Sequence, residues 1–359
     1  MKVAIVGAGL SGLSCAIELE RHGITPAIYE KRAHVGEALL YSTIWPRIVT
    51  RLTTDPLKYL KKEYSLELMP NAHIKRIIML SPENKAVERG SLGYIFRRSF
   101  QNHSLESQLL HYVKTSIIFD RYIEIEDIKN RFDYVVVADA NSISAQKLGV
   151  WTDTFTAHVR IATILGKFNL SEVIMWMNTK YVKNGFCYLV PNSEKEASLV
   201  MIVNGITSYE LDYYWKEFLF TENIEYYISA TTDAEHNCGF VQPLQVGNVL
   251  FTGNAAGLTD DLIGCGGLNA IESGMLAGRA IAVGKDYNAL AKPIFEDIVK
   301  LHELRKTYNR LDNNKLDIIV GELDTPILKN ALYNNPFFKM SELHKVARLY
   351  NNFSKKRAR

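Results

Sequence analysis

The sequence predicts an α/β protein, α+β overall, with a parallel sheet, an inserted antiparallel sheet and a helical C-terminal tail. Three observations predict this class. An apolar run at residues 3–6 enters a glycine-rich turn and then a helical pattern. Two later apolar runs, residues 132–139 and 248–252, have the composition of buried parallel strands. Short strand-like segments lie between these two runs, and the pattern from residue 287 onward is helical.

The first apolar run leads into Gly7-Ala8-Gly9-Leu10-Ser11-Gly12, which has Gly-x-Gly-x-x-Gly spacing. Gly7 suits a tight turn, Gly9 lets the backbone approach a pyrophosphate, and Gly12 lets the helix pack on the strand. The helix N-terminus, with Ser11 in its first turn, then faces the phosphate charge. Strand, glycines and helix occur in the required order, so they predict a Rossmann-like dinucleotide site.

The next element, a strand at residues 27–29, ends at Glu30. A carboxylate there can bind both ribose hydroxyls of an adenosine and would repel a 2′-phosphate. Glu30 therefore favours FAD or NAD over NADP, although Lys31 and Arg32 soften that preference. We expect Lys31 to lie in the same site.

Composition and residue spacing argue against a nucleic-acid-binding protein, a membrane-spanning protein and a metal site. The net charge of +3 argues against a nucleic-acid partner, and no run approaches the roughly 18 apolar residues of a membrane span. The four cysteines are far apart and form no CxxC pair, and no metal-ligand spacing occurs, so we expect no metal. We expect a cytoplasmic protein without a signal peptide. The basic residues 355–359 suit either a solvated terminus or a weak anchor on an anionic membrane.

The remaining elements follow in chain order. Residues 31–63 are predicted to be irregular and residues 64–96 to form strands, including 66–68. Ser104 is a suitable N-cap for a helix from 105 to about 113. Further strands are predicted at 172–177, 185–190 and 198–203, and helices at 209–220 and 267–282. The nucleotide unit is therefore expected to be discontinuous (1–63, 95–150 and 245–285), with a substrate unit (64–94 and 151–244) and a C-terminal helical region (286–359).

A second glycine-rich segment, residues 253–274, follows the strand at 248–252. It resembles the second FAD signature of the flavoproteins that include the geranylgeranyl reductases and the aromatic hydroxylases. The resemblance implies that the strand ends at Gly253 and that Asn254 hydrogen-bonds the ribityl chain through its side-chain oxygen. It also implies that the following helix directs its positive end at the flavin. The backbone that would line the flavin ring belongs to Gly264, Gly266, Gly267 and Leu268.

Three more segments resemble the same group. Arg98, with the helix entry at 104–109, would lie against the cofactor, and Asp139 would lie beside the pyrophosphate. Residues 186–191 resemble the strand that lines the substrate cavity of the reductases. The chain also departs from the family pattern: Asn254 replaces Asp, Asp261 replaces Pro, Cys265 replaces an acidic residue, Ala140 replaces Gly, and a Cys-Gly-Gly element is missing around 36–41.

The resemblance implies an FAD-dependent oxidoreductase that transfers a hydride from reduced flavin to an apolar alkene, such as an isoprenoid or another lipid. Two alternatives remain: a flavin-dependent monooxygenase on an aromatic or apolar substrate, and a flavin-binding protein without turnover. The electron donor is NAD(P)H, ferredoxin or another carrier. Four aromatic residues fit either an apolar pocket or an ordinary core: Tyr94, Trp176, Phe186 and Tyr188.

Cys265 is the one candidate for a catalytic side chain. The signature places it beside the flavin, at a helix N-terminus that would lower the pKa of its thiol. It would then be a proton donor or a redox-sensitive thiol. Alternatively, it is a small residue accommodated in a glycine-rich loop.

Overall fold

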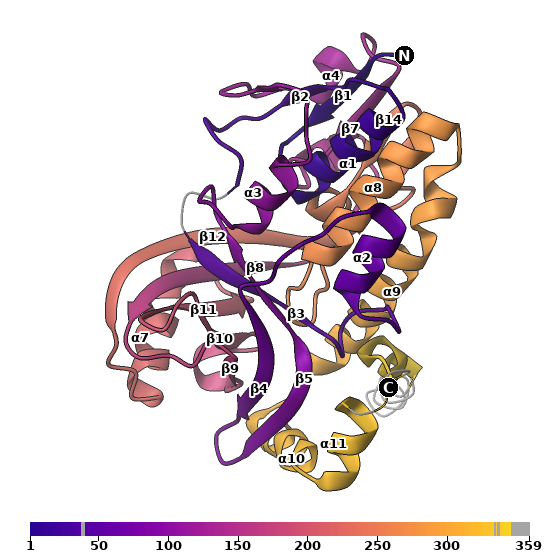
Figure 1. The fold of residues 1–359 in the computed structure, drawn as a ribbon. Helices are drawn as coiled ribbons and strands as arrows, with labels where there is room; N and C mark the ends of the chain where they lie inside the picture. The colour runs from indigo at the N-terminus through magenta and orange to yellow at the C-terminus, as the bar shows by residue number, and fades with distance from the viewer. Residues whose placement is uncertain (37–39, 334, 336–337, 346–359) are drawn as a thin grey trace.

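The computed structural model describes residues 1–36, 40–333, 335 and 338–345. Its strands form two sheets, drawn one above the other in Figure 1, and two long helices run along one side of both. The upper sheet has six strands in the order β13-β14-β7-β1-β2-β6, and the lower has eight in the order β12-β8-β11-β10-β9-β4-β5-β3.

The strands of the six-stranded sheet are β1 (Val3–Val6), β2 (Ala27–Tyr29), β6 (Ile117–Ile118), β7 (Tyr134–Val137), β13 (Gln245–Val246) and β14 (Val249–Phe251). Those of the eight-stranded sheet are β3 (Tyr41–Pro46), β4 (Ala72–Leu80), β5 (Lys85–Arg98), β8 (Trp151–Leu165), β9 (Glu172–Trp176), β10 (Phe186–Pro191), β11 (Glu196–Asn204) and β12 (Tyr227–Val241).

The α-helices are α1 (Leu10–Arg21), α2 (Pro56–Tyr64), α3 (Leu105–Leu110), α4 (Ile125–Ile128), α5 (Ile143–Lys147), α6 (Thr179–Val182), α7 (Leu211–Thr221), α8 (Gly267–Val283), α9 (Tyr287–Tyr308), α10 (Asn313–Leu323) and α11 (Pro326–Tyr333). Short 3₁₀ turns lie at Ser208–Glu210, Gly253–Ala256 and Met340–Leu343.

The six-stranded sheet is parallel except for its edge pair β13–β14. Its central strand β1 is buried along its whole length and pairs Ile5 with Ile28 of β2 and with Val136 of β7. Because the strands are parallel, the carboxyl ends of β1, β2, β7 and β14 meet at one edge, where ligands of open α/β sheets bind. The predicted class, with a parallel sheet, a second sheet and C-terminal helices, is confirmed.

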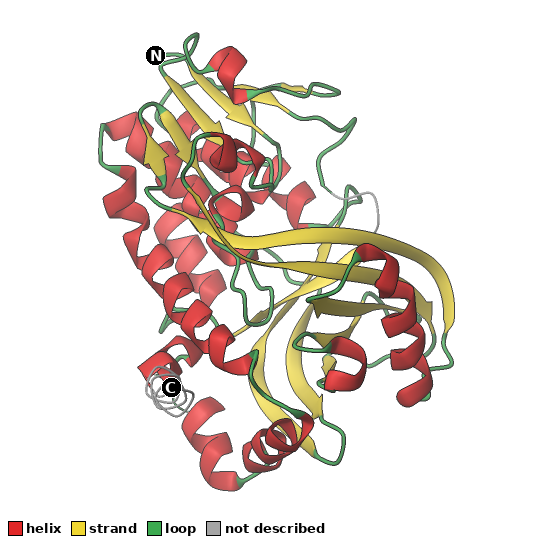
Figure 2. Ribbon diagram, turned by 180° about the vertical axis from the view of Figure 1, so that it is seen from behind, coloured by secondary structure: helices red, strands yellow, loops and turns green. Residues whose placement is uncertain are grey.

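The eight-stranded sheet is antiparallel except for the parallel pair β4–β9. The strands predicted at 172–177, 185–190 and 198–203 are β9, β10 and β11. The two longest strands, β8 and β12, were not predicted; Figure 2 shows them curving across the molecule.

The prediction that residues 31–63 are irregular is wrong in part, because β3 and α2 form there. β3 pairs with β5 from Tyr41–Arg98 to Pro46–Gly93, so this part of the expected nucleotide unit belongs to the eight-stranded sheet. β5 itself runs past the expected boundary at 94 and ends at Arg98. Residues 66–68 are not a strand; Leu66 and Leu68 are simply buried.

The helices around the six-stranded sheet pack closely because small residues line their contact. A Cβ on Gly274 of α8 would lie 2.1 Å from the carbonyl oxygen of Ser11 in α1, and one on Gly278 would lie 2.8 Å from that of Cys15. Ser104 caps α3 by accepting a hydrogen bond from the Ser107 amide at 3.1 Å, as predicted, although α3 ends at Leu110.

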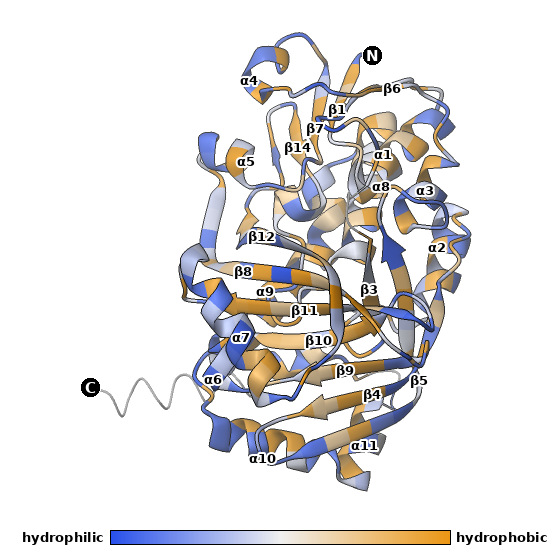
Figure 3. Ribbon diagram, turned by 90° about the vertical axis from the view of Figure 1, so that its left-hand side faces the viewer, coloured by the Kyte–Doolittle hydropathy of each residue, from blue (hydrophilic) through white to orange (hydrophobic). Residues whose placement is uncertain are grey.

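The principal apolar core lies between the six-stranded sheet and α1, α8 and α9. A second core cluster joins the eight-stranded sheet to α6 and α7, and a smaller one joins it to α10. Figure 3 shows apolar residues along the strands and mixed polar faces on α7 and α10. Within the described residues, no helix is both long and apolar enough to span a membrane.

Candidate functional site

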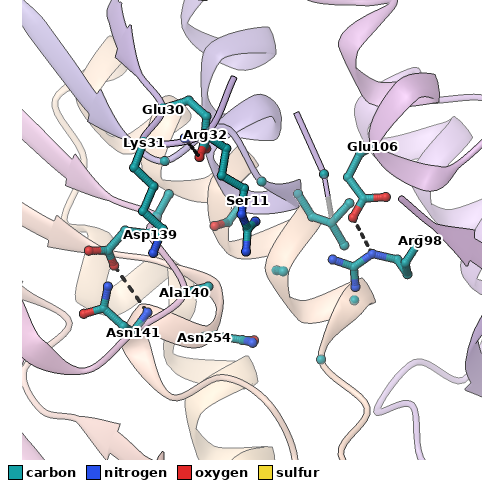
Figure 4. Close-up of a pocket in the computed structure, with 18 of the residues that line it drawn as sticks. Ser11, Glu30, Lys31, Arg32, Arg98, Glu106, Asp139, Ala140, Asn141 and Asn254 are labelled. Carbon is teal, nitrogen blue, oxygen red and sulfur yellow. Dashed lines mark hydrogen bonds and ion pairs between the residues drawn. The ribbon is translucent and has the colours of Figure 1, made fainter. Parts of the chain in front are cut away.

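A cleft opens at the carboxyl edge of the six-stranded sheet and extends past the first turn of α8 to the eight-stranded sheet. Figure 4 shows Glu30, Lys31 and Asp139 on one side and the Arg98–Glu106 pair on the other. Eleven of the predicted site residues line it: Gly7, Gly9, Ser11, Glu30, Lys31, Arg98, Asp139, Asn254, Gly264, Gly266 and Gly267. Residues far apart in the sequence therefore form one groove.

The three glycines of the first motif have different roles. Gly7 has φ +102°, and its Cβ would lie 2.4 Å from the carbonyl oxygen of Ala138. A Cβ on Gly12 would lie 1.9 Å from the carbonyl oxygen of Gly7, so this glycine serves the packing of α1 on β1 and does not line the cleft. A Cβ on Gly9 would meet no protein atom within 4 Å. The open space at Gly9 is what close approach of a pyrophosphate requires.

Glu30 lies at the end of β2 and is 8% exposed. Its Oε2 accepts a hydrogen bond from the Ala8 amide at 2.8 Å, and its Oε1 accepts one from the Arg32 amide at 3.0 Å. These amides fix the carboxylate beside the glycine turn, and each oxygen keeps a lone pair for another donor. The Glu30 carboxylate can therefore accept further hydrogen bonds in the cleft.

Arg98 forms an ion pair with Glu106 of α3. The Arg98 Nε donates to Glu106 Oε1 at 2.5 Å, and the guanidinium lies 5.8 Å from the ring centroid of Tyr41. The Glu106 side chain is 1% exposed, and its Oε2 has no hydrogen-bond partner in the described structure. A buried carboxylate of this kind fixes the orientation of the arginine that lines the cleft.

Asp139 follows β7, at the strand end next to the glycine turn. Burial raises the pKa of Asp139, and the Asn141 amide, 3.4 Å from its Oδ1, opposes the shift. Ala140, which stands where the family pattern has glycine, has φ +63°. This left-handed conformation is strained for a residue with a Cβ, which explains why glycine suits the position.

The second glycine segment forms the other end of the cleft. The Gly253 amide donates to Ser273 Oγ at 3.0 Å, and a Cβ on Gly253 would lie 2.9 Å from Ser11 Oγ, so Gly253 joins α1 to α8 without lining the cleft. The Asn254 Oδ1 accepts a hydrogen bond from the hydroxyl of Thr259. α8 begins at Gly267 with no side-chain cap, so its first amides lack helix partners at the cleft.

Cys265 does not line the cleft. Its thiol lies 3.4 Å from the carbonyl oxygen of Ile44 and borders a small second cavity on β3, together with Asp260 and Leu268. The expected lowering of its pKa is wrong: burial, and then the charge of Asp260, raise the pKa of the Cys265 thiol well above its usual value. Leu268 also lines this second cavity and, contrary to the prediction, does not line the cleft.

Several lining residues were not predicted. Arg121, Tyr122 and Ile123, between β6 and α4, line the cleft near Glu30, whose carbonyl oxygen accepts a hydrogen bond from the Arg121 amide, and no motif marks them. Tyr41 and Thr43 of β3 line the opposite end. Period-two alternation on β3 could have indicated that these two side chains share a face.

The four aromatic residues that fitted either a pocket or a core lie in different parts of the structure. Tyr188 lines the cleft, whereas Trp176 and Phe186 belong to core clusters. Tyr94 is buried and donates its hydroxyl hydrogen to Asp55. Only Tyr188 therefore takes the position expected of a pocket residue.

Comparisons with known proteins agree with this geometry. Residues 5–45 match the NAD(P)-binding Rossmann-like domain family. The chain is 22% identical to a digeranylgeranylglycerophospholipid reductase of Methanocella arvoryzae, over 93% of this chain and 96% of the relative. A solved geranylgeranyl bacteriochlorophyll reductase-like protein of Thermoplasma acidophilum superposes with a TM-score of 0.74 at 15% identity, over 97% of this chain and 98% of that one. This is the fold of the FAD-dependent oxidoreductases.

Another solved structure with this flavoprotein fold is a flavin-dependent brominase. It superposes with a TM-score of 0.67 at 13% identity, over 99% of this chain and 100% of that one. The predicted resemblance to the geranylgeranyl reductase and hydroxylase group is confirmed, and so is the prediction of FAD as the cofactor of this fold. The residues also fit the group, because Gly9 leaves space for a pyrophosphate and Glu30 lies where an adenosine ribose binds.

Proposed function

We propose that this protein is an FAD-dependent oxidoreductase that reduces an alkene in an apolar, isoprenoid-type lipid. FAD, when bound, would supply the redox chemistry by taking electrons from a donor and passing a hydride to the substrate, and water or an acid in the pocket would supply the proton. The observation that carries the proposal is the single cleft that joins a dinucleotide end at Glu30 to a helix N-terminus at Gly267.

At the dinucleotide end, the chain offers one group for each part of an ADP. The Glu30 carboxylate would accept the ribose hydroxyls, and the backbone at Gly9 with the N-terminus of α1 would face the pyrophosphate. Arg98, fixed by Glu106, would add a positive charge on the opposite wall. Tyr122 also lines the cleft, and an aromatic ring there could stack on an adenine.

At the other end, α8 presents its uncapped N-terminus at Gly266 and Gly267. The partial positive charge of a 17-residue helix favours negative charge at this position, which suits a reduced and anionic ring system. Tyr188 and Tyr41 supply aromatic surface across the cleft. Burial raises the pKa of Tyr188, so its phenol keeps its proton at neutral pH and can donate a hydrogen bond to a group bound there.

The substrate class rests on the relative whose name states that it reduces digeranylgeranylglycerophospholipid. A cytoplasmic protein that touches anionic membranes through residues 355–359 would have access to such lipids; those residues lie outside the described part of the chain. The electron donor is NAD(P)H or a ferredoxin-type carrier.

The test begins with purified protein loaded with FAD under anaerobic conditions. NADH, NADPH and reduced ferredoxin are offered in parallel, and bleaching of the flavin band identifies the donor. Digeranylgeranylglycerophospholipid in detergent micelles is then added, and mass spectrometry follows the gain of two hydrogens per double bond. We expect reoxidation of the flavin together with a saturated product. Failure to bind FAD would overturn the proposal outright.

The second candidate is a flavin-dependent monooxygenase. The likeness to a flavin-dependent brominase supports it, because that protein has the same fold and a name that indicates a reaction other than alkene reduction. The same preparation distinguishes the two when oxygen is admitted. Incorporation of ¹⁸O into an apolar or aromatic substrate, without saturation of the lipid, would favour the monooxygenase. Tight FAD binding with neither product would instead indicate a flavin-binding protein without turnover.

A further inference from the structure

Arg305 of α9 is among the largest side chains that are fully buried in the described structure, at 2% exposure. No cofactor motif includes it, and the sequence alone gives it no role. A buried guanidinium loses its hydration, so it depends on surrounding groups that replace the hydrogen bonds of water, and both terminal nitrogens of Arg305 have such partners whereas its Nε has none in the described structure. Its partners therefore show what the residue holds together.

Those partners come from separate segments. Arg305 donates to the carbonyl oxygens of Leu262 at 3.3 Å and Asn184 at 2.6 Å, and to Asn204 Oδ1 at 3.1 Å. Its guanidinium also lies 4.9 Å from the ring centroid of Phe155. Arg305 thus ties residue 262 of the loop before α8 to β8, β11 and the turn before β10.

His302 makes a second contact from α9 to the same loop. Its Nδ1 lies 2.7 Å from Asp261 Oδ2, and both side chains are mostly buried. Residues 302 and 305 are three apart, so they share one face of the helix. α9 therefore holds two successive residues of the loop, Asp261 and Leu262.

The loop is also braced from within by Asp260. Its Oδ1 accepts the amides of Leu262 and Ile263 at 3.0 and 2.7 Å, and its Oδ2 accepts that of Cys265 at 2.7 Å. With this internal bracing, a displacement of residue 262 would move the whole turn. The turn continues into Gly264 and Gly266, which line the cleft.

We propose that Arg305 and His302 are positioning residues for the flavin end of the site: through Leu262 and Asp261 they hold the loop whose backbone faces the cleft. The inference rests on the proposed FAD site and assigns a part of it to the C-terminal region. Neither residue lines the cleft; both act through the loop.

The experiment compares two ligands, because only one of them reaches the loop. ADP probes the end at Gly9 and Glu30, whereas FAD spans both ends. Arg305→Met keeps the apolar length of the side chain and removes all donors. We expect the Kd for FAD to rise about tenfold or more and the Kd for ADP to change by less than about twofold. Arg305→Lys should recover part of the FAD affinity, and His302→Gln should show a smaller loss of the same kind.

Lys306→Met is the matched control, since Lys306 lies on the same helix and pairs with Glu303 at 2.9 Å near the surface. It should leave both dissociation constants unchanged. Equal loss of FAD and ADP affinity in Arg305→Met would indicate general destabilisation and overturn the inference, as would unchanged FAD affinity. If Arg305→Met does not fold, the same comparison is made with Arg305→Lys and His302→Gln. A rise in the Kd for FAD without a matching rise in the Kd for ADP supports the inference, and any other outcome overturns it. A wild-type protein that binds ADP but not FAD would instead contradict the proposed function.

Discussion

Substitution by alanine should have different effects at two glycines of the first motif. Gly9 has φ −80° and ψ −168°, which alanine adopts freely, and its added Cβ would meet no protein atom within 4 Å. Gly12 would place its Cβ 1.9 Å from the carbonyl oxygen of Gly7. Gly9→Ala should therefore affect the cofactor, whereas Gly12→Ala should affect the fold.

The magnitudes follow from these contacts. For Gly9→Ala, the reduced entropy of the unfolded chain adds about 0.4–1 kcal/mol of stability, and alanine at an N-cap costs a similar amount. The free energy of unfolding of the FAD-free protein should thus change by less than about 0.5 kcal/mol. For Gly12→Ala, overpacking against a carbonyl should cost about 1–3 kcal/mol or more.

For FAD binding, the methyl group at Gly9 separates the backbone from the pyrophosphate. The loss of one charge-assisted hydrogen bond, about 1.5–3 kcal/mol, corresponds to a Kd about 10- to 150-fold higher. Fluorescence titration of FAD measures the Kd, and urea unfolding of the stripped protein measures stability. Gly9→Ala protein that binds FAD like the wild type, or that loses as much stability as Gly12→Ala, would refute this reading of the motif.

Three further predictions concern charges and the thiol. Burial raises the pKa of Asp260 to about 6, so folding favours its protonated form, and the contribution of Asp260 to the free energy of unfolding falls as pH rises from about 4 through 6. Relative to Asp260→Asn, the wild type should lose about 3 kcal/mol across that window, and parallel urea-unfolding curves at pH 4–7 would contradict this. Cys265→Ser should leave the rates of flavin reduction and turnover within about twofold, because the thiol faces Ile44 rather than the cleft; a larger drop in stopped-flow rates would return it to the mechanism. Arg98→Met should cost about 3 kcal/mol of unfolding free energy by stranding the Glu106 carboxylate, and the double variant with Glu106→Gln should recover most of it in thermal denaturation.

The sequence predicted best what local chemistry determines. The unit β1-α1-β2 depends on contacts within 30 residues, and the roles of Gly7 and Gly12 follow from the tight turn itself. Glu30 lines the cleft because the end of β2 must lie beside the end of β1 in a parallel sheet. These predictions needed no knowledge of the rest of the chain.

What the sequence missed depends on distant partners. Residues 227–241 carry mostly exposed side chains and no apolar alternation, so nothing local marks β12; it forms because β8 offers a long ladder, from Tyr227–Leu165 to Val241–Trp151. The orientation of Cys265 was missed for a related reason. Its position in the motif is fixed, but the amides that Asp260 binds turn the thiol toward β3.

The hydrogen bonding of Asn254 depends on a neighbouring residue that the motif does not include. From the sequence, asparagine in place of aspartate keeps an acceptor oxygen for the ribityl chain and loses only a charge. In the structure, that oxygen accepts the hydroxyl hydrogen of Thr259, five residues later. That oxygen keeps a second lone pair, and the amide nitrogen adds a donor that an ionised aspartate lacks. Asn254 can therefore both donate and accept at this cleft, where an ionised aspartate could only accept, and Thr259, which also lines the cleft, occupies one of its two acceptor positions.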